Sequence, residues 1–143
     1  MNQRIHVATL GINLTTLALL AVIAAIFTAP VRADEIPAAN PYSGNAKAIA
    51  SGKSWFRGVC ALCHGGRADG QGERGTGADL RKFQLGFRRF VETVKSGREV
   101  PGRTQNMPAW GAVLDDKTIY EIGAYLETLG MDGSNWKEGV VNK

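Results

Sequence analysis

The chain has 143 residues, a length that suits one domain with a modest hydrophobic core. Its 17 basic and 13 acidic residues give a formal charge of +4, an excess too small to indicate nucleic-acid binding. The two cysteines, Cys60 and Cys63, lie three positions apart, so pairing them would not give the long-range staple that small exported domains use.

The first 33 residues have the layout of a secretory signal peptide. A positively charged polar lead precedes an unbroken apolar run over residues 17–27, and Val31 and Ala33 are small enough to precede a cleavage site after Ala33. The run is short for a membrane span, but extending it back to Leu10 gives an alternative, an uncleaved anchor. Cleavage would leave 110 residues with a formal charge of +2, exported to the periplasm.

Residues 34–45 contain two prolines and a serine–glycine pair with little apolar periodicity, which predicts a flexible lead-in. From Ala46 onward, apolar and small residues recur at steps of three and four, which predicts a helix that ends in the cysteine–histidine motif. The residues on this stripe are Ile49, Gly52, Phe56, Val59 and Cys63. The folded domain is therefore expected to begin at residue 46.

Residues 65–77 hold six glycines, a density that indicates a loop. This loop does not bind phosphate in the usual way, because no strand precedes it and no Gly-Lys-Ser/Thr follows it. After the loop, apolar residues at helical spacing predict a second helix from about Gly86 to Ser96. They are Phe87, Phe90, Val91 and Val94.

Residues 100–111 contain two prolines and two glycines and are expected to form another loop. Asp115 or Asp116 can then cap a third helix, which Gly130 ends. Its apolar stripe is Ile119, Ile122, Leu126 and Leu129. Residues 131–143 read as a polar tail, and no strand pattern or internal repeat is present. The sequence thus predicts an all-α domain over residues 46–130.

The segment from Cys60 to His64 carries the clearest chemistry. Two thiols three positions apart at the end of a helix can add to the vinyl groups of one haem, while the adjacent histidine ligates the iron. The motif therefore predicts one covalently bound haem c, attached by Cys60 and Cys63, with His64 as the proximal ligand. Covalent attachment also prevents the cofactor from being lost outside the cell.

A zinc site and a redox-active thiol pair are the other known uses of such a motif. A structural zinc site needs four ligands, yet His64 is the only histidine outside the signal peptide and no further cysteine exists. A thioredoxin-like redox pair sits in a fold with strands, and none is predicted. A redox-active or structural disulfide between Cys60 and Cys63 remains as the alternative to haem attachment.

The sixth iron ligand follows by elimination. His6 leaves with the signal peptide, so the candidates are Met107 and Met131. Pro108 restricts the residue before it and stiffens the loop around Met107, whereas Met131 follows a helix-ending glycine. We therefore predict Met107 as the second metal ligand beside His64. Histidine–methionine ligation fills the iron and favours electron transfer over substrate binding, and the sequence carries no recognisable catalytic motif.

Residues 46–130 resemble class I monohaem cytochromes c. The motifs that carry this resemblance are Cys-Ala-Leu-Cys-His-Gly at 60–65, Asn-Met-Pro-Ala-Trp at 106–110 and Ile-Gly-Ala-Tyr-Leu at 122–126. The resemblance implies an all-α fold of three to five helices around one covalently attached haem, with the first and last helices crossing. It also implies contacts of Gly52 and Phe56 with Gly123 and Tyr125.

Family members commonly carry a Gly-Pro-Asp-Leu-like turn whose backbone carbonyl holds the other nitrogen of the proximal histidine. Here the segment 77–81 reads Gly-Ala-Asp-Leu-Arg, so the proline is missing and the owner of that carbonyl is left open. Arg81 is expected either to pair with a haem propionate or to be an ordinary exposed side chain.

Residues 79–81 and 107–111 are also similar to small cytochromes that accept electrons from quinoprotein alcohol or methanol dehydrogenases in the periplasm. The resemblance implies a non-enzymatic one-electron carrier that takes electrons from a periplasmic dehydrogenase and passes them to a terminal oxidase or another cytochrome. The alternatives are a haem enzyme or gas sensor with an open or labile sixth iron position, and a cytochrome subunit that stays bound to its dehydrogenase.

Charge is unevenly distributed along the chain. Residues 57–103 contain ten basic and five acidic side chains, whereas residues 115–138 contain two and six. This asymmetry predicts either an oriented docking face or ordinary solvated surface. Ala61, Leu62 and Trp110 are the candidate docking residues beside the haem edge.

Overall fold

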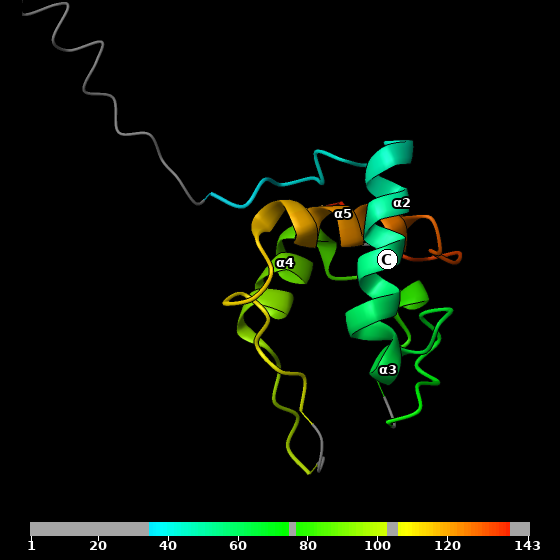
Figure 1. Cartoon of the computed structure of the whole chain (residues 1–143), viewed down its shortest axis with the longest axis vertical. Coiled ribbons are helices and arrows are strands. Elements are labelled where there is room, and N and C mark those ends of the chain that lie inside the picture. Colours follow the sequence, from blue (N-terminus) through cyan, green and yellow to red (C-terminus); the bar gives the residue numbers. More distant parts are fainter. Residues whose placement is uncertain (1–34, 75–76, 103–105, 138–143) are drawn as a thin grey trace, which may run out of the picture. The chain divides into compact units, whose positions relative to one another are not determined.

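The computed structural model describes residues 35–74, 77–102 and 106–137, so the predicted signal peptide lies outside the described residues. The chain divides between Glu35 and Ile36, and every described helix belongs to the second unit. In chain order the elements are α2 (Ala46–Trp55), the π-helical segment η1 (Phe56–Cys60), α3 (Ala61–His64), the 3-10 turn η2 (Leu80–Lys82), α4 (Gly86–Ser96) and α5 (Asp116–Glu127) (Figure 1).

The predicted all-α class is confirmed. Over the described ranges the chain forms no β-strand, and an isolated antiparallel bridge pairs Arg98 with Met107. None of the helices in these ranges has the length and apolar character needed to cross a membrane.

The segments α2, η1 and α3 follow one another without interruption, so the predicted first helix runs from residue 46 to residue 64 (Figure 1). Asn45 caps its start, because its side-chain oxygen accepts the Ala48 N–H at 3.0 Å. Over residues 56–60 the helix widens to π geometry, which is rare and concentrates at functional sites. A π turn takes one residue more than an α turn. The cysteine–histidine motif therefore faces a different side of the helix than it would in a continuous α-helix.

The first and last helices cross in contact, as expected. A Cβ atom on Gly52 would overlap the Glu121 carbonyl group, so only glycine lets the backbones of α2 and α5 approach this closely. One turn after Gly52, at the start of η1, the ring of Phe56 packs against that of Tyr125 with centroids 5.6 Å apart. The Ser51 hydroxyl donates a hydrogen bond to the Glu121 carboxylate, which further stabilises the contact between α2 and α5.

The expected meeting of Gly52 with Gly123 is wrong. A Cβ atom on Gly123 would instead contact Asn40, Phe87 and Phe90. Positions 121 and 123 are about 200° apart around an α-helix, so they face opposite sides. Helix α5 is therefore buried on two sides, with α2 on one and α4 on the other.

The second and third predicted helices are present. Helix α4 spans the predicted residues 86–96, and its apolar stripe is buried. At α5, Asp115 is the cap, because its carboxylate accepts the Thr118 N–H at 2.8 Å. The helix ends at Glu127, shortly before Gly130.

The segment before α2 is packed rather than flexible, so the expectation that order begins at residue 46 is wrong. Asn40 is only 6% exposed, and its side-chain amide donates a hydrogen bond to the Tyr120 carbonyl oxygen at 2.9 Å. Ile36 packs against the hydrophobic core. Prolines and turn residues exclude a helix here, but they do not exclude packing.

The segment after α5 is also part of the domain, in contrast to the predicted polar tail. Over residues 131–137 the chain returns to the start of α4, where Asn135 N–H donates to the Phe83 carbonyl at 2.7 Å. Phe87 N–H in turn donates to the Trp136 carbonyl at 3.1 Å. The second bond satisfies an N–H group in the first turn of α4, which has no partner within the helix.

Candidate haem-binding site

The two cysteines of the motif lie at the C-terminal end of the first helical run, where Cys60 ends η1 and Cys63 belongs to α3. Both are partly buried free thiols. Burial, together with the nearby Cys63, raises the pKa of Cys60 to about 11. A redox-active dithiol depends on a lowered thiol pKa, so the environment of Cys60 weighs against a redox-active disulfide.

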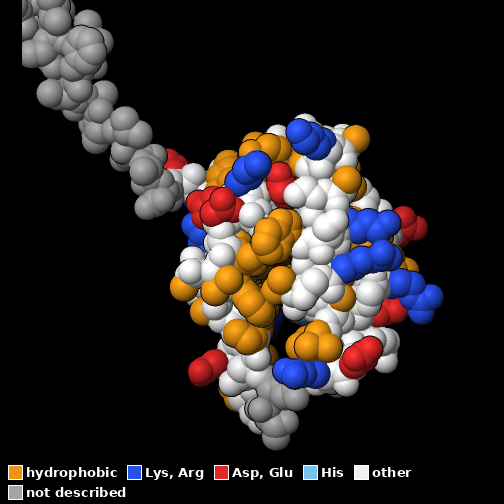
Figure 2. All heavy atoms as spheres, in the orientation of Figure 1, with side chains coloured by type: hydrophobic (Ala, Val, Ile, Leu, Met, Phe, Trp, Pro, Cys, Tyr) orange, Lys and Arg blue, Asp and Glu red, His pale blue; other side chains and the backbone are white. Residues whose placement is uncertain are grey.

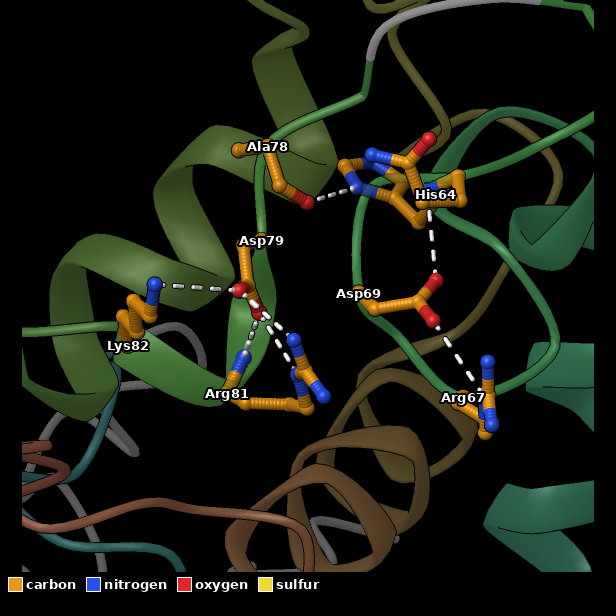
Figure 3. A network of polar contacts seen from close by, with 8 residues as sticks. His64, Arg67, Asp69, Ala78, Asp79, Arg81 and Lys82 are labelled. Atoms are coloured by element: carbon orange, nitrogen blue, oxygen red, sulfur yellow. Dashed lines mark hydrogen bonds and ion pairs between the residues drawn. The ribbon is translucent and has the colours of Figure 1, made fainter.

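The imidazole of His64 is oriented by a backbone carbonyl. Its Nδ1 lies 3.0 Å from the Ala78 oxygen, and donation of the Nδ1 proton to that oxygen leaves Nε2 free to bind a metal (Figure 3). Ala78 is thus the owner of the carbonyl that the sequence left open. It occupies the position where family members have proline, so this contact forms without the proline.

The glycine-rich loop wraps the end of the helix that presents His64. Its N–H groups bind the carbonyl groups of the last helical turn, which have no partner within the helix. These bonds join Gly70 N–H to the His64 carbonyl (2.8 Å), Arg74 N–H to the Leu62 carbonyl (3.0 Å) and Gly77 N–H to the Cys63 carbonyl (3.0 Å). The loop therefore holds His64 through its backbone as well as through its ring.

Two of the loop glycines are required by close approach to the motif. A Cβ atom on Gly77 would lie 2.5 Å from the Cys63 carbonyl oxygen and 2.8 Å from His64 Nδ1. A Cβ atom on Gly72 would overlap the Leu62 carbonyl oxygen. Part of the glycine density that predicted a loop thus reflects packing against the cysteine–histidine motif.

A charged cluster follows Ala78 along the chain (Figure 3). Arg81 donates to Asp79 through Nε and a terminal nitrogen, each at 2.9 Å, and Lys82 Nζ lies 3.7 Å from the same carboxylate. The hydrogen bond from Arg81 lowers the pKa of Asp79 to about 2. Arg81 is therefore half-buried and bound to Asp79, which differs from the freely exposed side chain that was one expectation.

Met107 is fixed to the end of α4 by its backbone. Its N–H and carbonyl groups both bond to Arg98, at 3.0 Å and 2.9 Å, and Trp110 N–H donates to the Val94 carbonyl at 2.9 Å. Gly97 joins the two segments with a φ of +73°, and a Cβ atom there would lie 2.5 Å from the Met107 carbonyl oxygen. The segment that carries Met107, the Met107 strap, thus has a defined backbone and is not a free loop.

The predicted site residues from both halves of the chain reach one hydrophobic core. Cys60, Leu80, Met107 and Trp110 are partly buried and pack against the same cluster of buried residues. Cys63 and His64 follow Cys60 by less than two helical turns. Figure 2 shows hydrophobic side chains bordering a hollow in one face of the molecule.

These groups fit a haem. The paired thiols, the free Nε2 of His64, the Met107 thioether and the apolar surroundings are the donor set and the medium that a c-type haem needs. A metal site of another kind is not favoured, because the described part of the chain contains no group of three or more His, Cys, Asp or Glu placed to bind an ion.

Paired thiols and a histidine at the end of the first helical run, a methionine strap before the last helix, and an all-helical fold together define a class I monohaem cytochrome c domain. Residues 47–126 match the family described as "Cytochrome C oxidase, cbb3-type, subunit III", and the chain belongs to this family. Membership confirms the predicted haem c and a role in electron transport.

Two curated relatives have the same description. The "Cbb3-type cytochrome c oxidase subunit CcoP" of Azospirillum sp. (strain B510) is 34% identical over 105 residues, which cover 68% of this chain and 34% of the relative. The CcoP of Azospirillum brasilense is 31% identical over 105 residues, with the same coverage. The chain thus spans about a third of the length of these relatives.

A solved structure supports the fold. The crystal structure of cytochrome CL from the marine methylotrophic bacterium Methylophaga aminisulfidivorans MPT aligns with a TM-score of 0.50 and 20% sequence identity, covering 72% of each chain. This likeness confirms the class I cytochrome c fold.

Proposed function

We propose that this chain is a periplasmic one-electron carrier whose single haem is attached through Cys60 and Cys63 and ligated by His64 and Met107. The observation that supports this most is that each candidate ligand is held by hydrogen bonds to a residue from another part of the chain. The Ala78 carbonyl holds the His64 ring, and paired backbone bonds to Arg98 hold the Met107 strap. When bound, haem supplies an iron that changes its charge by one electron.

The surrounding residues tune and protect this site. The hydrogen bond from His64 Nδ1 to the Ala78 carbonyl raises the basicity of the imidazole. A methionine thioether raises the reduction potential relative to a second histidine, and the apolar cluster excludes water. With His64 and Met107 both bound to the iron, no position would be left for a substrate, and the protein would transfer electrons without being an enzyme.

The ligation is tested by spectroscopy and carbon monoxide binding. The ferric protein should show the near-infrared methionine-to-iron band, and the reduced protein should not bind carbon monoxide readily at neutral pH. Met107→Ala should abolish the band and admit carbon monoxide. Met131→Ala is the matched control, because Met131 is 47% exposed, and it should change neither property.

Ready carbon monoxide binding by the unmodified reduced protein would instead support the haem enzyme or gas sensor. A near-infrared band that survives in Met107→Ala would contradict Met107 as the ligand.

For partners, we infer a terminal oxidase of the cbb3 type or another cytochrome as the electron acceptor. This is supported by the family and by relatives that are named as oxidase subunits. The inferred donor is a periplasmic dehydrogenase, for which a quinoprotein alcohol or methanol dehydrogenase is supported by the sequence resemblance alone. Oxidation of the reduced protein by membranes containing a cbb3-type oxidase, and reduction of the ferric protein by a purified quinoprotein dehydrogenase, test the two sides separately.

A second candidate function is a cytochrome subunit that stays attached to a larger complex. It is favoured by the relatives, which are named as subunits of an oxidase and are about twice as long as this chain. Copurification with a dehydrogenase or an oxidase through a salt wash would support the subunit, whereas release by salt would support the mobile carrier.

Export to the periplasm is part of the proposal. Sequencing the N-terminus of the protein purified from the periplasmic fraction should give Asp34 as the first residue. Recovery in the membrane fraction with an intact N-terminus would support the uncleaved anchor.

A further inference from the structure

The carbonyl that orients His64 belongs to the peptide group between Ala78 and Asp79. Its oxygen lies 3.0 Å from His64 Nδ1. An alanine side chain cannot fix the direction of its own carbonyl group, so the surrounding residues must do so. Gly70 supports one side, because a Cβ atom there would lie 3.3 Å from the Asp79 nitrogen and 3.4 Å from the Ala78 carbonyl carbon.

Asp79 anchors the other end of this peptide group (Figure 3). Its carboxylate accepts the Arg81 N–H at 3.1 Å, which closes a turn, and the Arg81 guanidinium donates to both oxygens of the same carboxylate at 2.9 Å. Two-point pairing of this kind is stronger and more directional than a single contact. The two side chains are only 22% and 31% exposed, so the pair is better ordered than a fully exposed ion pair.

The turn formed by Asp79 and Arg81 is also tied to two other parts of the chain. The Leu80 N–H donates to the Ala68 carbonyl at 2.9 Å, which joins the turn to the glycine-rich loop. The Arg81 carbonyl accepts the Met131 N–H at 2.9 Å, which joins it to the segment after α5. These backbone bonds do not depend on the two side chains, so substitutions of the side chains should loosen the turn without unfolding the loop.

We propose that the paired side chains of Asp79 and Arg81 hold the Ala78 carbonyl in place and thereby set the reduction potential of the haem iron. Both are positioning residues, because they act through Ala78 on the proximal histidine. A firm bond from His64 Nδ1 makes the imidazole more basic, which stabilises ferric iron and lowers the potential. The inference rests on the proposed ligation by His64 and Met107 and deepens it.

A redox titration of the haem-loaded protein separates positioning from a direct effect of charge. Asp79→Asn and Arg81→Gln remove opposite charges, so a through-space effect would raise the potential in the first variant and lower it in the second. Loss of positioning should instead raise the potential in both. A lower potential in Arg81→Gln, or an unchanged potential in either variant, would overturn the proposal.

The matched controls are Glu92→Gln and Arg89→Gln. They remove the same two charges from an exposed ion pair within α4, whose Arg89 nitrogen and Glu92 oxygen lie 3.1 Å apart. Both should leave the potential nearly unchanged. Shifts as large as those in the Asp79 and Arg81 variants would contradict a specific role for the turn.

The hydrogen bond itself is followed by NMR of the reduced, ¹⁵N-labelled protein. In Asp79→Asn and Arg81→Gln the His64 Nδ1 proton should move upfield and exchange faster with solvent. An unchanged proton in both variants would overturn the proposal, even if the potential shifts. The near-infrared methionine band checks the ligation separately. Its absence from the unmodified ferric protein would contradict the ligation, whereas its presence with an unmoved potential would contradict only the positioning role.

Discussion

Gly77 lies where the glycine-rich loop packs against His64, and there is no room for a methyl group at this position. In Gly77→Ala the new Cβ would press on His64 Nδ1 and on the Cys63 carbonyl, so the bond from Nδ1 to Ala78 should weaken. A less basic imidazole stabilises ferric iron less, and the reduction potential should therefore rise. Overpacking of this kind should also lower the free energy of unfolding by about 1–3 kcal/mol.

A redox titration and a denaturant titration measure these two effects. The control is Gly66→Ala, because a Cβ atom at Gly66 meets nothing within 4 Å. If Gly66→Ala and Gly77→Ala behaved alike, contact with His64 would not be the cause.

Gly97 has the corresponding role on the methionine side. Gly97→Ala places a methyl group against the Met107 carbonyl at a positive φ, so the strap should shift and the near-infrared methionine band should weaken. Gly102→Ala separates strain from contact. Gly102 also has a positive φ, of +80°, but a Cβ atom there meets nothing within 4 Å. A band that weakened equally in both variants would attribute the effect to backbone strain alone.

Asp79 gives the domain a defined response to acid. Its folded-state pKa of about 2 is below the ordinary value of 3.8, so its contribution is fully present above about pH 4 and is lost as the pH falls towards 2. Asp79→Asn removes this contribution. Denaturant titrations at pH 7 and pH 3 should show that Asp79→Asn loses less stability on acidification than the unmodified protein. An unchanged pH dependence would mean that the Arg81–Asp79 pair does not persist in solution.

At the residue scale, the sequence predicted the cysteines and the histidine because covalent haem attachment restricts their spacing. It could not identify Ala78, because a backbone carbonyl carries no side-chain signal. It also could not distinguish Gly77 from Gly66, since both are glycines in one glycine-rich loop and only the folded structure shows which of them touches the motif.

Among the elements, the π-helical segment has the most specific consequence. It adds one residue between the Gly52 crossing and the cysteine pair. Inserting an alanine after Gly58 would add a further residue that the single π turn does not absorb, so the insertion should rotate the motif by about 100° relative to α2. Cys60 would then no longer pack against the core while Gly52 packs against α5, so the variant should mature with little or no covalent haem.

Mass spectrometry and haem staining of the exported protein measure this outcome. Gly58→Ala is the control, because a Cβ atom at this position meets nothing within 4 Å, and it should retain the haem. Full haem attachment in the insertion variant would show that the helix register is not important.

The helices themselves were predictable to different degrees. Helices α4 and α5 have clear apolar stripes and a cap or a glycine near their ends, so the predicted bounds of α4 and the predicted start of α5 agree with the structure. Helix α5 ends at Glu127, so Leu129 of the predicted stripe lies beyond it. The π segment could not be predicted, because a pattern with a period of 3.6 residues does not register one inserted residue. The packing of Asn40 and Trp136 was missed because both lie in segments without periodicity and are held by long-range contacts.

For the whole molecule, charge provides a test of docking. Arg57, Arg74 and Arg98 are exposed within the basic stretch of residues 57–103. If this stretch steers an acidic partner, reduction by the donor should slow as the salt concentration rises. Stopped-flow reduction of Arg57→Glu should be slower at low salt and depend less on salt. Lys47→Glu, an exposed change outside the stretch, is the control. Salt-independent reduction of the unmodified protein would contradict steering.

The fold class and the cofactor were predictable at this scale, because one haem and three helices are each encoded by local patterns. The extent of the domain was not, since it depends on contacts between the two ends of the folded unit. The electron-transfer partner could not be predicted either. Net charge indicates the sign of the surface that the protein attracts, but it does not give the shape of the partner.

The way the two candidate ligands are held has a consequence for the order of assembly. His64 is oriented by a carbonyl 14 residues away, within a loop that folds back on its own helix. Met107 lies 43 residues beyond His64 and is held by the end of α4. Closing the roughly threefold longer loop costs about 1 kcal/mol more in chain entropy, so the histidine side can form first. A nascent chain can thus present a preformed half-site to haem before the methionine half closes over it.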